Sequence, residues 1–144
     1  MKIFSPLSFF GEAHLLILAC YDREAVKKLP ERGAELTVAG AFEDITMDAA
    51  KVEKLREQRA KDEVEKASYA VYNTAISVTH MDLVAVSRGL GTCWIGMFDK
   101  EKVREILGLD ERYGIVCFLQ IGYALQAPSP RPRLPLDDTV LQRI

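Results

Sequence analysis

The stretch that decides the fold of this chain is Gly-Leu-Gly-Thr-Cys-Trp-Ile-Gly-Met-Phe-Asp, residues 89–99. It lies between a long apolar helical pattern over residues 67–88 and a shorter helical pattern that ends at Leu107. The first two glycines allow the backbone to turn sharply out of the first helix. Gly96 leaves room beside the backbone, where a flat ligand could lie against N–H groups. A helix cap followed by a buried strand accounts for the same residues without a ligand, so the residues alone leave both interpretations open.

Length and composition describe an ordinary globular protein. The chain has 144 residues, of which 49% are hydrophobic and 28% charged, and its net charge is −2. This length is typical of one domain with its own core. The near-neutral charge gives no electrostatic case for nucleic acid or an anionic membrane. No apolar run approaches the roughly 20 residues that span a bilayer, and the first residues lack a signal-peptide cleavage pattern. We therefore expect a cytoplasmic protein that binds neither nucleic acid nor membrane.

Two apolar runs and one apolar helix define the expected core. His14–Cys20 and Ile115–Gly122 are nearly continuous apolar segments, which indicates neighbouring strands that are buried on both faces. The first of them is expected in the centre of the sheet. Ala67–Arg88 is apolar nearly all round, and such a helix must be buried in the core or against another subunit. These elements predict an α+β fold.

Capping residues place two short helices. Asp22 is a predicted N-cap for a helix over Glu24–Leu29, and Asp99 for a helix over Lys100–Leu107. Gly108 is the predicted C-cap of the second helix. The caps therefore fix where the chain leaves the first strand and where it enters the second.

The remaining segments are polar or interrupted. Residues 30–41 are expected to be irregular because Gly33 and Gly40 break the pattern. Residues 48–66 are charged and favour a solvated helix. Residues 126–144 carry repeated prolines, which predicts an extended, non-helical tail on a single domain of residues 1–144. Such a tail could reach another chain.

No residue pattern indicates a metal site or a catalytic side chain. Cys20, Cys93 and Cys117 have no metal-like spacing, and an odd number of cysteines argues against a disulfide framework. Each is expected to be a small structural residue. His14 and His80 lie far apart in apolar patterns and are expected to be core or interface residues, although a general-base role for His80 is possible in principle.

From Ala75 to Gly122 the chain resembles the C-terminal half of the nitroreductase family of FMN-dependent oxidoreductases, and the resemblance extends more loosely over nearly the whole chain. Several short features carry it, in the family's order. They are Thr79-His80-Met81-Asp82-Leu83, the loop Gly-Leu-Gly-Thr-Cys-Trp-Ile-Gly from Gly89 to Gly96, Phe98-Asp99, Leu107-Gly108-Leu109, Ile121-Gly122-Tyr123, and the basic pair Arg131 and Arg133 before Leu-Pro-Leu.

The resemblance implies a fold, a cofactor and an assembly. The fold would be a nitroreductase-like sandwich of a central, mainly antiparallel sheet with helices. FMN would lie in a groove between the subunits of a homodimer, reduced by NAD(P)H and reoxidised by a nitroaromatic, quinone or similar acceptor. No catalytic side chain is implied, because in this family the flavin carries the electrons.

The resemblance also assigns cofactor-binding residues. The backbone of Trp94, Ile95, Gly96 and Met97 would line the flavin ring. Arg131 and Arg133 correspond to a basic pair that reaches the FMN phosphate. In an extended segment, residues i and i+2 point the same way, so two guanidiniums could clamp one phosphate.

The chain departs from the family pattern at its start. It lacks the Arg-Arg-Ser-x-Arg and Pro-Ser-x-x-Asn-x-Gln-Pro-Trp motifs, and with them the family's N-terminal helices. The family's flavin-contacting Asn and Lys would fall near Ser5 and Ser8. We therefore expect weaker FMN binding than in complete family members. Two alternatives stay open: a shortened, non-enzymatic dimerising relative with weak or no flavin binding, or one subunit of a heteromeric flavoprotein.

Overall fold

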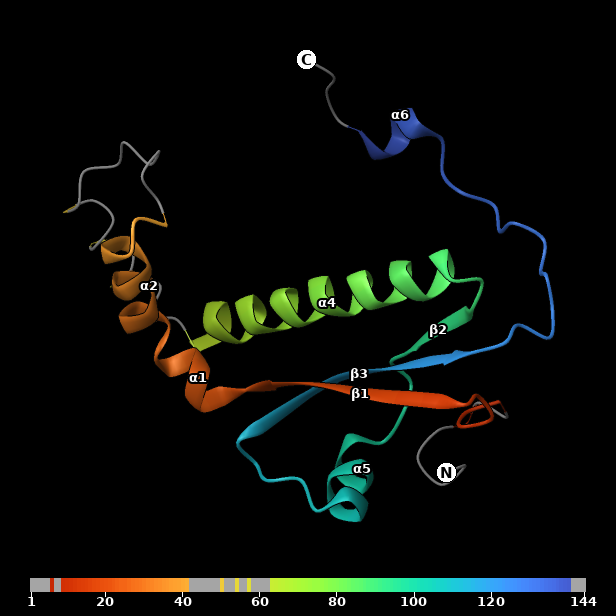
Figure 1. Ribbon diagram of the computed structural model, residues 1–144, viewed down its shortest axis with the longest axis horizontal. Coiled ribbons are helices and arrows are strands. Elements are labelled where there is room, and N and C mark those ends of the chain that lie inside the picture. The colour runs from red at the N-terminus through yellow and green to blue at the C-terminus, as the bar shows by residue number, and fades with distance from the viewer. Residues whose placement is uncertain are drawn as a thin grey trace.

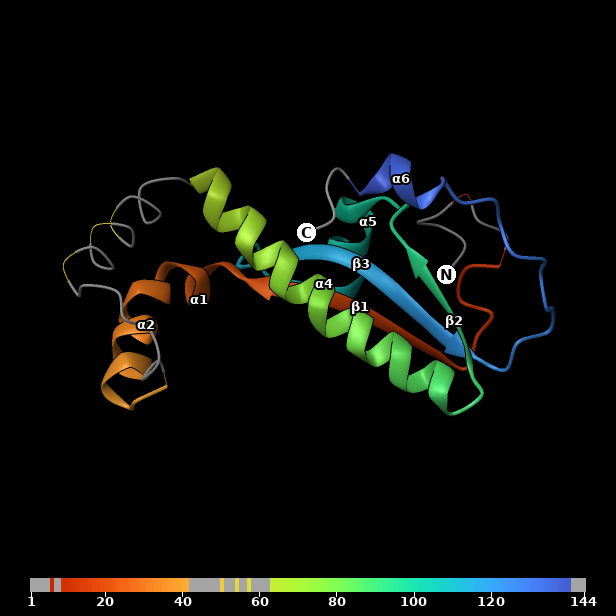
Figure 2. The same ribbon diagram turned by 90° about the horizontal axis from the view of Figure 1, so that it is seen from above.

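The structure, a computed structural model, describes residues 6, 9–41, 50, 54, 57 and 63–140. Along the chain it contains β1 (Leu15–Asp22), α1 (Arg23–Lys27), α2 (Leu29–Val38), α4 (Glu63–Ser87), β2 (Gly91–Ile95), α5 (Lys100–Leu107), β3 (Tyr113–Gly122) and α6 (Leu136–Thr139). The sheet has α4 along one face and α5 on the other, while α1 and α2 extend beyond its end (Figures 1 and 2). The predicted α+β class is confirmed.

The described sheet has three strands in the order β1-β3-β2, and both pairings are antiparallel. The predicted neighbourhood of the two apolar strands is therefore confirmed. The expectation that the first of them is central was wrong, because β3 is central and β1 lies at an edge, with Leu15 49% exposed. Side chains of β1 nevertheless pack on both faces of the sheet. An apolar run alone therefore does not distinguish an edge strand from a central one.

A β-bulge interrupts the alternation of side chains along β3. Ala19 pairs with Cys117 but Cys20 pairs with Ile115, so Val116 is an extra residue on β3. The consecutive residues Val116 and Cys117 therefore both pack on the α4 side, whereas Ile115 packs on the α5 side. This part of β3 is apolar throughout because both faces of the sheet are covered.

The core is divided by the sheet into two clusters. On the α5 side the buried members are Phe10, Ile95, Val103, Ile115 and Phe118. On the α4 side they are Ala19, Val78, Ala85, Cys117, Leu119 and Ile121. Gln120, a buried polar residue, is satisfied because its amide accepts from the Gly11 N–H and donates to the Phe9 carbonyl, each at 3.2 Å. This pair of bonds fixes the segment before β1 onto β3.

The helix α4 buries only one stripe in this chain. Ala70, Val78 and Ala85 are at most 6% exposed. Other apolar residues of the helix are more than half exposed, namely Tyr72, Ile76, Leu83, Val84 and Val86. The prediction of a long helix is confirmed. The expectation that it is a core helix was wrong, because the side of α4 that carries these five residues is exposed in this chain. One sheet face can cover only one side of a helix, so the remaining apolar surface has no cover among the described residues of this chain.

The predicted caps are confirmed. The carboxylate of Asp22 accepts from the N–H groups of Glu24 and Ala25, and that of Asp99 accepts from Glu101 and Lys102. Gly108 takes a left-handed conformation with φ of 61° at the end of α5. The first of these helices ends at Lys27, slightly before the expected Leu29.

Residues 29–38 form α2, so the expectation of an irregular segment was wrong. Pro30 takes the second position of the helix. Backbone N–H groups in the first turn have no acceptor within the helix, so the lack of an N–H in proline costs no hydrogen bond there. Arg32 and Glu35 form an ion pair at 2.7 Å one turn apart. Most of the segment 48–66, like Ser5 and Ser8, lies outside the described residues.

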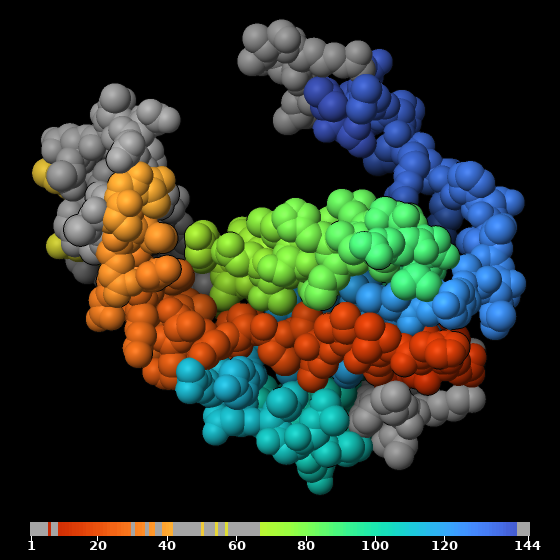
Figure 3. Space-filling view, in the orientation of Figure 1, coloured from red at the N-terminus to blue at the C-terminus, as the bar shows by residue number. Residues whose placement is uncertain are grey.

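The tail leaves the end of β3 and stands away from the body (Figures 1 and 3). The expectation that it contains no helix was wrong, because Leu136–Thr139 form the single turn α6. Residues 126–135 are extended, as predicted, and among the described residues their only hydrogen bonds run from α6 to the Pro135 carbonyl, within the tail itself. Of the helices that the structure describes, none combines the length and apolarity needed to cross a bilayer.

Candidate functional site

The candidate site begins where α4 turns into β2. Gly89 has a φ of 76°, and its N–H donates to the Val86 carbonyl at 2.9 Å. The N–H of Leu90 donates to the Ala85 carbonyl at 3.1 Å. These two bonds form a Schellman motif, which ends the helix and sends the chain directly into β2. The interpretation of residues 89–95 as a helix cap followed by a strand is therefore correct.

The backbone becomes open immediately after β2. Ile95 is 1% exposed and belongs to the core, so the whole residue is enclosed and the open segment begins after it. Gly96 is exposed, and a Cβ placed on it would have no neighbour within 4 Å. Its φ lies outside the left-handed region. Neither its conformation nor its packing against the described residues requires glycine at this position, which is consistent with a ligand or a second chain lying against it.

Side chains on either side of Gly96 are accessible. Met97 is 64% exposed and Trp94 is 40% exposed. The structure thus brings four of the predicted cofactor-binding residues together as one short, partly open segment, Trp94–Met97. The arrangement can offer backbone polar groups and apolar side-chain surface to a planar ligand.

A further residue at this site was missed by the sequence analysis. Asp82 of α4 accepts a hydrogen bond from the Trp94 indole Nε1 at 3.0 Å through Oδ2, and one from the Thr92 hydroxyl through Oδ1. The signal in the sequence was an aspartate within a helical stretch, residues 67–87, that has no other acidic residue, lysine or arginine. Its two partners lie 10 and 12 residues further along the chain, so no rule of helical spacing connects them.

The basic pair is not brought to this loop within one chain. Arg131 and Arg133 are exposed in the extended part of the tail, which forms no hydrogen bond or ion pair with described residues outside the tail. Figures 1 and 2 show the tail running from the end of β3 to α6, which lies apart from α4 in both views. Any shared role of the pair and the loop must therefore involve a second chain or a movement of the tail.

The histidines and cysteines form no centre. His14 is exposed and contacts the ring of Tyr123 edge-on at 5.9 Å, while His80 is exposed on α4, so neither is a core residue. Burial raises the pKa of the Cys20 and Cys117 thiols, which disfavours their reactive thiolate forms. Cys93 packs against the core on the α5 side. Within the described residues, no group of three or more His, Cys, Asp or Glu could hold a metal ion.

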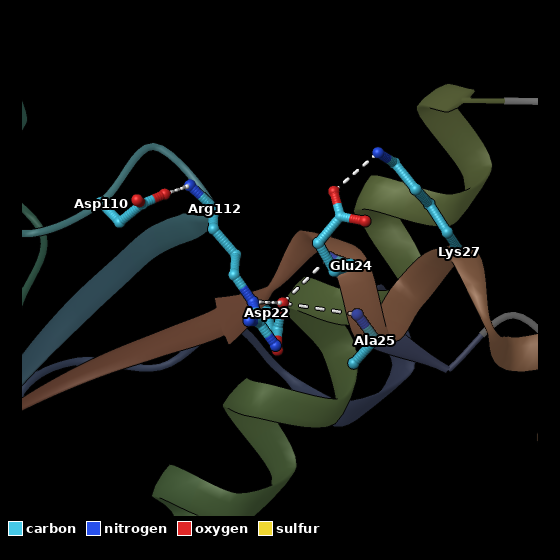
Figure 4. Close-up of polar contacts among 6 residues, drawn as sticks. All are labelled: Asp22, Glu24, Ala25, Lys27, Asp110 and Arg112. Carbon is cyan, nitrogen blue, oxygen red and sulfur yellow. Dashed lines mark hydrogen bonds and ion pairs between the residues drawn. The ribbon is translucent and has the colours of Figure 1, made fainter.

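A polar cluster lies away from the loop Trp94–Met97, at the C-terminal end of β1 (Figure 4). The guanidinium of Arg112 donates to both carboxylate oxygens of Asp22, and this contact, more than the backbone bonds of the helix cap, lowers the pKa of Asp22 to about 2. Lys27 pairs with Glu24 at 2.7 Å. A cavity of about 570 Å³ lies beside these residues. Because these two cations are already paired with carboxylates, the cluster is best explained as a structural junction between β1, α1 and β3.

Comparison with known proteins identifies the family. A sequence profile of the nitroreductase family matches residues 6–123. The match covers most of the chain, including the whole sheet and the segment Trp94–Met97. The chain belongs to the nitroreductase family.

Individual relatives match at low identity. The chain is 28% identical over 140 residues to an NADH dehydrogenase of Thermus thermophilus, which covers 93% of this chain and 66% of that protein. It is 28% identical over 123 residues to a candidate NAD(P)H nitroreductase, MhqN, of Bacillus subtilis, which covers 85% of this chain and 58% of that protein. The chain therefore matches less than two thirds of the length of these relatives.

Solved structures share the fold. A nitroreductase family protein of Streptococcus pneumoniae superposes with a TM-score of 0.70 at 21% identity, covering 99% of this chain and 72% of that one. A candidate nitroreductase of Exiguobacterium sibiricum, solved in complex with FMN, superposes with a TM-score of 0.68 at 22% identity, covering 95% and 68%. At these identities the likeness concerns the fold alone.

Proposed function

We propose that this chain is an FMN-dependent oxidoreductase of the nitroreductase type, which passes electrons from NAD(P)H to a nitroaromatic, quinone or similar acceptor in the cytoplasm. The observation that carries the proposal is the open backbone at Gly96, where neither the backbone conformation nor any contact with the described residues requires glycine. Membership of the family and the FMN complex of a structural neighbour support the identity of the ligand.

The residues at the loop suit a flavin ring. The ring is flat and has polar atoms along one edge, so it needs a backbone that no side chain covers. The exposed backbone at Gly96 and the half-exposed Trp94 and Met97 would bind and orient it and exclude water from one side. When bound, FMN supplies the redox chemistry, and no catalytic side chain is required of the protein. In this proposal Arg131 and Arg133 hold the phosphate.

The proposed working form is a homodimer. The exposed apolar face of α4 includes Ile76 and Leu83, which are 55% and 61% exposed. The tail carries Leu125 and Leu134, which are 98% and 71% exposed. Contiguous apolar surface of this kind is typical of subunit interfaces. A second copy seated on α4 would cover this surface, and its tail would bring a basic pair toward the Trp94–Met97 loop.

The proposal is tested by flavin binding and turnover in matched variants. The purified chain is expected to bind FMN and, with FMN present, to oxidise NADH or NADPH with a quinone as acceptor. Gly96→Val should abolish both properties because it fills the open face, without loss of folding. Arg133→Ala should weaken FMN binding, whereas Arg23→Ala, which removes an exposed arginine at the start of α1, should not. Equal binding by all four proteins would exclude this loop as the flavin site.

A further inference from the structure

We propose that Asp82 is the positioning residue of the flavin site: it holds the Trp94 side chain and thereby sets the place of the Gly96 backbone. This inference rests on the proposed function, and it concerns a residue of α4 that would not itself touch the flavin. It follows from how β2 is fastened to the rest of the fold.

The strand β2 is weakly held by the sheet. It has five residues and pairs with β3 along one edge, and no described strand pairs with its other edge. The chain leaves it at Gly96, two residues after Trp94. A short strand with one hydrogen-bonded edge can shift or twist, so an additional attachment is needed to fix the loop that follows it.

Asp82 supplies that attachment through both carboxylate oxygens. One accepts from the Trp94 indole at 3.0 Å and the other from the Thr92 hydroxyl. Thr92 and Trp94 are two residues apart on β2 and therefore project to the same face, toward α4. Both donors bind a charged acceptor, and such hydrogen bonds are about twice as strong as neutral ones. The carboxylate thus fastens the strand to α4 at two points.

The same bonds decide the rotamer of the indole. Trp94 is 40% exposed, so packing alone leaves part of its surface in solvent. With Nε1 bound to Asp82, the ring is held near α4. Without this bond the indole would be free to turn across the open backbone. Asp82 therefore keeps the predicted ring-binding surface open.

The test uses the intrinsic fluorescence of Trp94, the single tryptophan of the chain. In the absence of flavin, Asp82→Ala should shift the emission to longer wavelength and increase quenching by acrylamide. It should also raise the FMN dissociation constant about tenfold. Asp82→Asn keeps an acceptor for the indole and should show a smaller change in both. Thr79→Ala removes only a hydrogen bond to the carbonyl of Ala75 on the same helix, and should resemble the wild type.

The outcomes separate this inference from the proposed function. Unchanged emission in Asp82→Ala, with folding verified by urea denaturation, would overturn the positioning role. Changed emission with unchanged FMN affinity would also overturn it, because the hydrogen bonds of Asp82 to Thr92 and Trp94 would then have no effect on the flavin site. If the wild type itself binds no FMN, the proposed function fails and this inference fails with it, whatever the emission of the variants.

Discussion

Single residues in this fold are constrained by what lies directly opposite them, and Gly114 is an example. It pairs with Tyr21 across β1 and β3, and a Cβ at this position would overlap the Tyr21 ring. We expect Gly114→Ala to lower the free energy of unfolding by about 1–3 kcal/mol, the usual cost of overpacking a filled site. Urea denaturation measures this. Gly96→Ala is the control, since its Cβ meets nothing, and equal stability of the two variants would show that the Tyr21 ring lies elsewhere.

Asp22 gives a prediction on the pH dependence of stability. Its folded-state pKa of about 2 lies below the ordinary 3.8, mainly because of Arg112. A depressed pKa means that the stabilising contribution is present above the unfolded value and is lost as the pH falls toward the folded one. Asp22→Asn keeps the helix cap but not the charge. The wild type should therefore be more stable than the variant at neutral pH, and the difference should shrink between about pH 4 and pH 2.

Thermal denaturation of both proteins across this range checks the prediction. Asp138→Asn on the exposed α6 is the control and should leave the wild-type profile unchanged. A stability difference between wild type and Asp22→Asn that stays constant down to pH 2 would mean that the Arg112 contact does not hold in solution.

At the scale of elements, the ends of the helices are the parts that local chemistry fixes. The N–H groups of Gly108 and Leu109 donate to the carbonyls of Glu105 and Arg104, which makes the end of α5 a Schellman motif like that of α4. At a φ of 61°, Gly108→Ala should cost about 1–2 kcal/mol, because a Cβ is strained in this region. Gly108→Asn should cost less. Urea denaturation of the wild type and the two variants measures the free energy of unfolding. An equal loss of stability in Gly108→Ala and Gly108→Asn would contradict the role of the left-handed conformation.

Features that depend on neighbouring residues in the chain could be predicted from the sequence, and features that depend on long-range packing could not. The caps at Asp22, Asp99 and Gly108 rest on neighbours in the chain, and all three were predicted. The helix over residues 29–38 was not predicted because Gly33 and Gly40 break the helical pattern in the sequence, although Gly33 lies inside α2. The edge position of β1 depends on the order of the strands in the sheet. That order is set by long-range pairing, which the apolar pattern of one segment does not reveal.

The candidate site also has a part that local sequence indicates and a part that depends on long-range packing. The segment Trp94–Met97 was assigned to the site by its glycines together with the family resemblance, and its role in binding flavin stays a prediction. The link from Asp82 to Trp94 was missed, because it depends on how α4 packs on the sheet. The apolar pattern of α4 correctly predicted a helix but not its burial, since one face is left for a partner or for solvent.

At the scale of the whole molecule, the exposed face of α4 gives a prediction on assembly. The wild type is expected to be a dimer at micromolar concentration. Replacing Ile76 and Leu83 with glutamate should give a monomer, because it places charges in the proposed interface. Light scattering coupled to gel filtration measures the mass. Arg23→Glu, on another surface, should remain dimeric. A monomeric wild type would refute the proposed dimer.

The central claim is that this chain binds FMN at the Trp94–Met97 loop, with Arg131 and Arg133 on the phosphate. A charge-assisted contact contributes about 1.5–3 kcal/mol, and each 1.4 kcal/mol is a factor of about ten in affinity. With the phosphate assigned to one basic pair, we predict a dissociation constant above about 1 μM.

Titration of the purified chain with FMN, followed by flavin fluorescence, tests the claim most directly. We predict saturable binding with one FMN per chain, weakened further in Arg133→Ala. A submicromolar constant would contradict the expected weak hold on the phosphate. Absence of any saturable binding would contradict the claim itself.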